Sequence, residues 1–175
     1  MTGDYLLEKL LDSFQNSYDV ERTCDINGDI YEAYASFNAT SAKYVLVKKA
    51  ELWRAKCFEH VFFRLKKNLE KEDIENFRNK IDAYIEPQLV RGGLRWPQKD
   101  HMYTYMTAVF ICEEGISEEA VKAVKHFHYI KNYLFTVRGY SEARILVFDL
   151  KNQKIFGNRA AKDMVKGYKK AGIMN

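Results

Sequence analysis

The sequence predicts an α+β fold in one domain spanning residues 1–175, with a mostly antiparallel or mixed sheet covered by helices. Strand-like segments arrive in groups of three instead of alternating singly with helices, which favours this class. Aromatic residues make up 14% of the chain, as in sheet-rich cores, while 2 Pro and 9 Gly argue against long linkers. The expected order is α-βββ-α-β-α-βββ-α.

The first half of the chain accounts for a helix, three strands and a second helix. Apolar side chains at helical spacing between Leu6 and Phe14 predict a helix over residues 3–17. Segments rich in Val, Tyr and Phe predict an antiparallel meander. Its strands are expected over 30–38, 43–53 and 56–65, with turns near Thr40–Ser41 and Arg54–Ala55. Helical spacing returns from Ile74 to Ile85, and Pro87 is expected to end that helix at about Glu86.

The second half begins with a loop over residues 91–97 that presents Trp96, followed by a strand over 102–112. Ser117 before two glutamates is typical of a helix N-cap and predicts a helix to about Phe127. Strands are expected over 129–137, 141–150 and 153–156. The last element is a helix over 158–170, which completes the predicted order.

Composition narrows the cellular setting. The three cysteines, Cys24, Cys57 and Cys112, are scattered and odd in number, and no basic region precedes an apolar stretch at the start, so we expect a reducing cytoplasm. The longest apolar runs are far below the roughly 20 residues needed to cross a bilayer, which predicts no transmembrane segment and no membrane partner. A net charge of +4 is too small to imply a nucleic-acid partner by itself.

Several segments carry a resemblance to a known family. They are Tyr44 to Ala50, Trp53, Glu59 to Phe63, His101 to Tyr105, Gly139 to Leu150, and Asn158 to Ala160. On these residues the chain resembles a bacterial protein family of unknown function. The resemblance spans most of the chain and implies no activity.

The candidate chemistry starts from an acid in an apolar strand. Alternation over residues 56–65 places Glu59 in one row with Cys57, Val61 and Phe63. A buried carboxylate without a partner is costly, so such a group is usually paired, protonated or functional. Glu59 is therefore the first residue to test.

Charged residues recur on the strand over 141–150, where Glu142 and Arg144 share a face. If that row meets Glu59, one interpretation is a structural ion pair. The other is a polar pocket that binds a small anionic or zwitterionic ligand, because Arg presents a planar fork to carboxylate or phosphate. Trp96, on its Gly-rich loop, either packs back over the core, which is the favoured interpretation, or lines such a pocket, with His101 and Tyr103 at the rim. A protein partner remains an alternative, with Trp96 as its contact.

An enzymatic alternative comes from the order of elements. A helix, three strands, a helix and a strand is also the order in the core of restriction-endonuclease-like nucleases, in which acids bind Mg²⁺. Glu8, Glu51 and Glu59 are the candidate acids. The third strand departs from that pattern, since Glu59 is followed by His60-Val61 where an acid, one spacer and a Lys are expected. The alternative therefore includes a degenerate relative, with Mg²⁺ as the cofactor only if it is active.

Other functions have weaker signals. A metal site is not predicted, since Cys57 and His60 fall on opposite strand faces, while His126 and His128 would face one side only if their segment is extended. Basic residues with interleaved aromatics, including Lys48, Lys49 and Arg64, make a nucleic-acid partner possible but not favoured over a solvated face. The sequence thus predicts a non-catalytic ligand-binding or regulatory module, with no cofactor.

Overall fold

The computed structural model describes residues 1–45 and 50–174, with side chains for 1–39 and 56–174. It contains a mixed sheet between two layers of helices, so the predicted α+β class and order of elements are confirmed. The helices are α1 (Gly3–Phe14), α2 (Lys71–Lys80), the π-helix η1 (Ile81–Val90), α3 (Glu118–His126), the 3₁₀ turn η2 (Arg159–Ala161) and α4 (Lys162–Lys170). The strands are β1 (Asp19–Ile26), β2 (Asp29–Val45), β3 (Ala50–Leu69), β4 (His101–Ile116), β5 (Ile130–Asn132), β6 (Tyr140–Asp149) and β7 (Lys154–Gly157).

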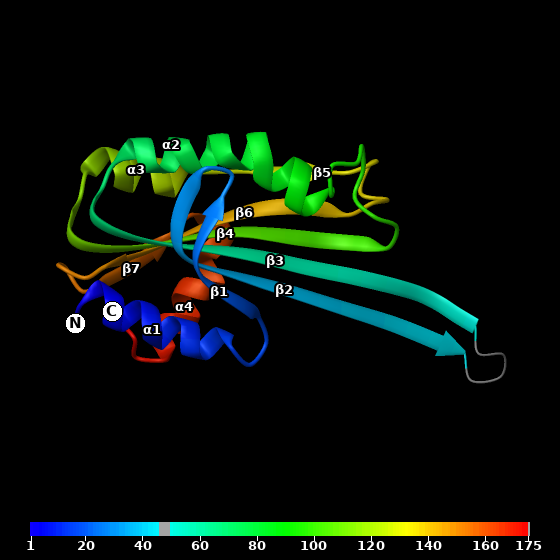
Figure 1. Ribbon diagram of the computed structural model, residues 1–175, viewed down its shortest axis with the longest axis horizontal. Coiled ribbons are helices and arrows are strands. Elements are labelled where there is room, and N and C mark those ends of the chain that lie inside the picture. Colours follow the sequence, from blue (N-terminus) through cyan, green and yellow to red (C-terminus); the bar gives the residue numbers. More distant parts are fainter. Residues whose placement is uncertain (46–49, 175) are drawn as a thin grey trace.

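Three layers are visible in Figure 1, with α2 and α3 above the sheet and α1 and α4 below it. The strand order is β1-β2-β3-β4-β6-β5, and β7 also pairs with β6. β1, β2 and β3 form an antiparallel meander, whereas β3, β4 and β6 are parallel. The parallel pairs arise because α2 and α3 each carry the chain back across the sheet between successive strands.

Each face of the sheet has its own core. The upper core contains Phe62, Met106 and Ile145 from the sheet, packed under α2, η1 and α3. The lower core contains Val61, Phe63, Val109, Leu146 and Phe148, packed against Leu7, Leu11 and Phe14 of α1 and side chains of α4. Successive residues of β3 therefore enter different cores, and the sequence-predicted alternation about Glu59 is correct.

The meander differs from the expected one in its boundaries. β2 runs straight through Thr40–Ser41 and β3 through Arg54–Ala55, so both predicted turns are wrong. The first strand is instead β1, which the sequence analysis missed. Its signal was Asn27-Gly28, where both residues have positive φ, as the tight turn between β1 and β2 requires. Part of the strand expected over 43–53 lies outside the described residues, as do Lys48 and Lys49.

Two further boundaries were wrong. Pro87 does not end the helix at Glu86, because the chain widens into the π-helix η1 and continues to Val90. The Arg91 amide bonds the Glu86 carbonyl five residues back, which is the π-helical spacing. The strand expected over 129–137 is only the three residues of β5, after which Leu134, Phe135 and Thr136 turn with positive φ. No helix among the described residues is long and apolar enough to cross a membrane.

Candidate functional site

Charged side chains meet on the lower face of the sheet, where the parallel strands lie side by side. In the register, Glu59 of β3 is opposite Tyr105 of β4, and Thr107 of β4 is opposite Arg144 of β6. Because the pleat period is two, these side chains project toward the helices α1 and α4. Tyr18, just after α1, reaches the same point.

The Glu59 carboxylate is held by neutral donors. The Tyr18 hydroxyl donates to Oε2 at 2.7 Å, and the Thr107 hydroxyl donates to Oε1 at 2.9 Å. Burial first, and then the Glu59 charge, raise the pKa of Tyr18 well above its usual value, so this phenol stays a donor. Each oxygen of Glu59 is thus hydrogen-bonded without any help from a cation.

Arg144 is less well satisfied than its neighbour. Its Nη1 is 3.6 Å from Glu59 Oε1, a contact within ion-pair range that is longer than a hydrogen bond. The guanidinium carbon is 3.2 Å from the centroid of the Tyr105 ring, in a cation–π contact. Its Nε is buried and has no hydrogen-bond partner among the described residues. An Arg side chain that is only 17% exposed therefore retains donor capacity.

A pocket of about 460 Å³ opens beside this arginine. Glu59 and Arg144 form its polar side, and its other walls include Phe14, Met164 and Tyr168 from α1 and α4. Burial raises the pKa of Tyr168 to about 12, with a smaller contribution from Glu59, so its hydroxyl remains neutral. The site therefore combines one cationic group with an apolar chamber, within the size range of small-molecule sites.

Glu142 and Tyr103 lie on the same face as this pocket. Glu142 pairs in register with Tyr105, yet Arg144 contacts Glu59 and not Glu142 among the described ion pairs. The Tyr103 ring packs on Tyr105 with 4.8 Å between centroids. A hydrogen bond to the Cys57 thiol and burial raise the pKa of Tyr103 to about 12. The condition set by the sequence, that the row of Arg144 meets that of Glu59, is therefore fulfilled beside an aromatic cluster, although Glu142 does not join the ion pair among the described residues.

Trp96 and His101 lie on the opposite face, so the prediction that they share a pocket with Glu59 is wrong. Trp96 packs against the upper core, and Arg95 stacks on its ring. His101 is buried between Phe58 and Tyr133 and bonds the Arg138 carbonyl and the Thr104 hydroxyl. A bulge between β3 and β4 at this point leaves Met102 without a partner and changes the face that His101 enters.

The three acids of the nuclease alternative do not converge. Glu8 lies on the exposed side of α1 and pairs with Arg22 of β1. The backbone of Glu51 is eight residues from Glu59 along β3, a separation of about 26 Å. Among the described residues, no group of three potential metal-binding side chains comes together. The prediction that Glu8, Glu51 and Glu59 form one metal site is therefore wrong, although the order of elements that suggested it is observed.

A second charged cluster, on the upper face, was missed. Glu86 of η1 accepts hydrogen bonds from Arg91, from Tyr133 and, through an ion pair, from Lys131, at distances of 2.7 to 3.2 Å. Burial would raise the pKa of Glu86, but these partners outweigh it and hold that pKa below its usual value. Sequence alone could not place Arg91 and Lys131 at one carboxylate, because the π-helical turn that joins Glu86 to Arg91 has no simple signature and Lys131 arrives from β5 through the strand pairing.

The sequence did not indicate that Tyr18, Thr107 and Tyr168 belong to the site. Tyr18 follows a helix and Tyr168 lies on a helix, and an aromatic at helical spacing is usually core packing. Thr107 does fall in the row opposite Glu59, but its role depends on the parallel register of β3 with β4, which sequence did not reveal. Strand order was therefore the missing information.

A three-layered α+β protein with a charged pocket under two helices is the class that fold and site define. The family model of a domain of unknown function (DUF8052) matches residues 2–170, and the chain belongs to this family. No curated protein and no solved structure matches the chain.

Proposed function

We propose that this protein binds a small anionic molecule with an apolar body, in the pocket between the sheet, α1 and α4. The observation that carries the proposal is the half-buried Arg144 at the wall of an apolar chamber: its ion pair with Glu59 is 3.6 Å long, and its Nε has no partner among the described residues. A guanidinium without short hydrogen bonds gains from a bound carboxylate or phosphate, which accepts charge-assisted bonds from its outer nitrogens.

The state of Glu59 favours a ligand over a purely structural ion pair. A structural pair gains most from short, bidentate hydrogen bonds between carboxylate and guanidinium. Here the Glu59 oxygens accept from Tyr18 and Thr107, and the guanidinium is held at 3.6 Å. Glu59 supplies balancing charge while leaving the donors of Arg144 available.

The chemistry of the walls defines the rest of the ligand. Phe14, Met164 and Ile173 offer apolar contact, and Tyr168 adds an aromatic surface. A strongly charged or sugar-like body would lose hydration there without compensation. The site therefore suits a carboxylate or phosphate ester carried on an aliphatic or aromatic group, bound without chemical conversion.

The cellular setting belongs to the same proposal. Cys24, Cys57 and Cys112 are all free thiols, which suits a reducing compartment. Together with the resemblance to a bacterial family, this supports ligand binding in a bacterial cytoplasm.

The test compares matched probes by calorimetry: octanoate against octanol, and phenyl phosphate against phenol. We expect the anions to bind and the neutral analogues to bind at least about tenfold more weakly, because only the anions engage Arg144. Arg144→Met keeps the stem volume and should abolish this preference. Glu59→Gln removes a nearby negative charge and should tighten anion binding severalfold.

Two outcomes would overturn the proposal. One is equal affinity for octanoate and octanol in the wild-type protein. The other is an Arg144→Met variant that folds normally and retains the preference for anions. Arg22→Met removes an exposed arginine of β1 that does not line the pocket, and it is the control for loss of an arginine.

A further inference from the structure

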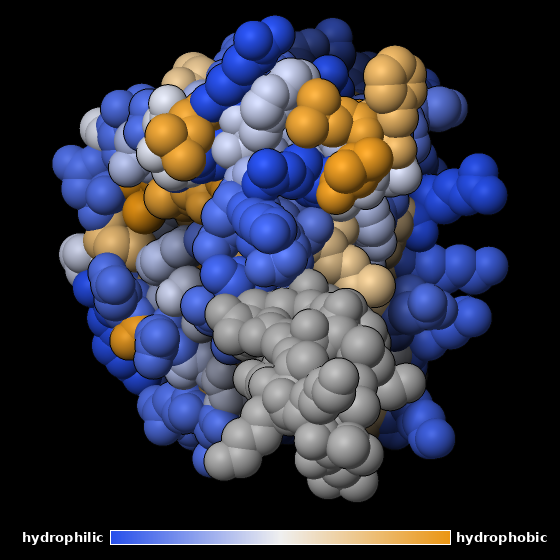
Figure 2. Space-filling view, turned by 90° about the vertical axis from the view of Figure 1, so that its right-hand side faces the viewer, coloured by the Kyte–Doolittle hydropathy of each residue, from blue (hydrophilic) through white to orange (hydrophobic). Residues whose placement is uncertain are grey.

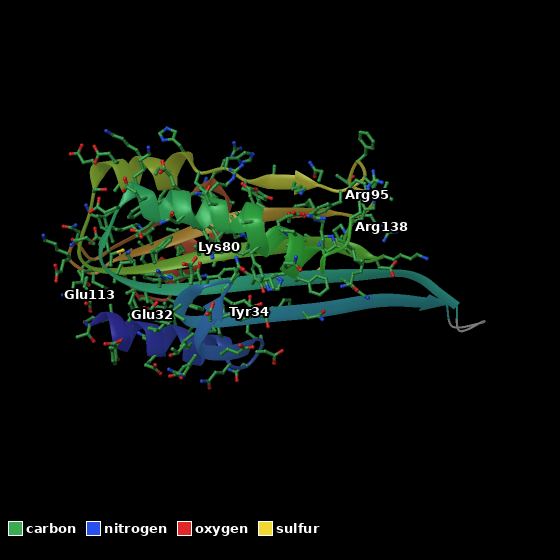
Figure 3. All side chains as sticks on the ribbon, turned by 45° about the horizontal axis from the view of Figure 1, so that its top comes forward. Glu32, Tyr34, Lys80, Arg95, Glu113 and Arg138 are labelled. Atoms are coloured by element: carbon green, nitrogen blue, oxygen red, sulfur yellow. The ribbon has the colours of Figure 1, made fainter. Side chains whose placement is uncertain are left out.

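A second feature, independent of the pocket, is found where two loops meet at one end of the sheet. The loop before β4 (residues 91–100) and the loop between β5 and β6 (residues 133–139) are joined by the Arg138 guanidinium, which donates to the Pro97 carbonyl at 3.3 Å. Figure 3 shows Arg95 and Arg138 at this same end. Gly139 packs so closely under Met102 that a Cβ there would lie 2.1 Å from the Met102 carbonyl oxygen.

These loops expose apolar side chains. Phe135 is 99% exposed and Val137 is 79% exposed, while Leu94 and Met102 are more than half exposed. Figure 2, which faces this end, shows apolar groups standing among hydrophilic ones in its upper part. Large apolar side chains grouped in this way mark interaction sites more often than isolated ones do.

The exposed turn is held in place from below. Leu134, Phe135 and Thr136 all have positive φ, a conformation that is strained for bulky residues. Tyr133, at the base of the turn, is fully buried and bonded to Glu86 and Ser141. The Arg138 amide closes the turn on the Tyr133 carbonyl. The fold therefore keeps Phe135 in water at a cost in strain, instead of letting it collapse onto the core.

Charge at this end is positive. Residues 91–102 and 130–140 contain five basic side chains and one acid, so their net charge of +4 equals that of the whole chain. Arg91 and Lys131 are engaged with Glu86. Arg95 and Lys99 are exposed, and Arg138 is half-buried between the loops. A partner for this end is therefore anionic as well as apolar.

We propose that this loop end docks on an anionic lipid surface, with Phe135 and Val137 inserted between the headgroups. The two most exposed apolar groups, Phe135 and Val137, stand almost free of the protein on one turn, which suits a yielding hydrocarbon layer, whereas a folded partner would need a matching deep pocket. Val137 and Leu94 are aliphatic and cannot stack on bases, which disfavours single-stranded nucleic acid. Cations beside inserted apolar groups provide the electrostatic attraction to anionic headgroups. The expectation of no membrane partner rests on the absence of a spanning segment, which contact with one surface of a bilayer does not require.

The experiment is co-sedimentation of the full chain with vesicles of phosphatidylcholine, with or without phosphatidylglycerol. We expect binding to the mixed vesicles that weakens with salt. Phe135→Ser combined with Val137→Ser should lower the partition coefficient at least about tenfold, since two apolar side chains no longer enter hydrocarbon. Arg95→Gln combined with Lys99→Gln should lower it about tenfold on the mixed vesicles.

Matched controls change the same chemistry elsewhere. Ile30→Ser removes an exposed apolar group on the β1–β2 hairpin, and Lys151→Gln with Lys162→Gln removes two exposed cations. Neither should alter partitioning by more than about twofold. Unaltered melting temperatures would show that the loop variants fold. The proposal fails if mixed vesicles do not bind, if the apolar double variant binds as well as wild type, or if an oligonucleotide binds with the same dependence on Phe135.

Discussion

Glu59 and Glu86 are both carboxylates inside this fold, on opposite faces of the sheet, and they differ in how their charge is balanced. Glu86 is 2% exposed as a residue and meets Arg91, Lys131 and Tyr133 at hydrogen-bond distance. Glu59 is bonded by two neutral hydroxyls, and the one cation that pairs with it among the described residues, Arg144, remains 3.6 Å away. The partners of Glu86 are all engaged at hydrogen-bond distance, whereas Arg144 beside Glu59 has donors without an acceptor among the described residues.

The difference separates a structural role from a binding role. A buried charge whose partners are all engaged fixes the positions of the elements that carry them, here η1, β5 and the loop before β4. A half-buried cation such as Arg144, without short hydrogen bonds, is held in place by the surrounding fold, and a ligand can complete its hydrogen bonds. The variants below test whether stability and binding divide between the two faces in this way.

The largest effect is expected for Glu86→Gln. Removing this charge leaves Arg91 and Lys131 facing each other without a counter-ion, so we expect unfolding free energy to fall by about 3 kcal/mol. Urea denaturation at neutral pH measures the change. Affinity for octanoate should be unaltered, because the cluster is on the other side of the sheet. A loss below about 1 kcal/mol would contradict the structural role of Glu86.

The second-largest effect is expected for acid pH, which should lower the free energy of unfolding through His60 on the upper face. Burial lowers the pKa of His60 from 6.5 to about 4, and its Nδ1 is 2.6 Å from the Tyr34 hydroxyl oxygen. As the pH falls below about 6.5, His60 becomes protonated in the unfolded chain, whereas in the folded chain it stays neutral until about pH 4. Stability should therefore fall by about 2 kcal/mol across this window, allowing for partial exposure of His60.

The variant His60→Gln isolates this contribution. It keeps an acceptor near Tyr34 but cannot titrate, so its stability should be flatter between pH 6.5 and 4. His101, whose pKa burial also lowers, adds a slope of the same sign in both proteins. Parallel stability curves for wild type and variant would show that His60 does not titrate as the structure indicates.

A smaller effect is expected for Glu59→Gln. The amide oxygen can still accept from Tyr18 or Thr107, and Arg144 keeps its cation–π contact with Tyr105. We expect a loss of about 1 kcal/mol by thermal or urea unfolding, clearly below that of Glu86→Gln. A loss as large as that of Glu86→Gln would make the two faces equivalent and remove the main support for a binding site.

Sequence reasoning succeeded where a local pattern determines structure. The alternation around Glu59 and the helical spacing of Leu7, Leu11 and Phe14 follow from single elements, and both were predicted correctly. It failed where the answer depended on pairing between distant strands. The parallel register that brings Thr107 and Arg144 to Glu59 is set by the crossover through α2 and α3, and the bulge that turns His101 to the other face has no sequence signal.

Tyr18→Phe is the smallest change and the most direct test of the contrast. Loss of the hydroxyl frees Glu59 Oε2, and the carboxylate can then turn toward Arg144 and form the short ion pair that it now lacks. Stability should change by no more than about 1 kcal/mol, because one hydrogen bond is exchanged for another. Affinity for octanoate should fall severalfold, since the donors of Arg144 become engaged. If calorimetry shows unchanged affinity, the hydroxyl of Tyr18 does not hold Glu59 away from Arg144. The long distance between Glu59 and Arg144 would then have another cause.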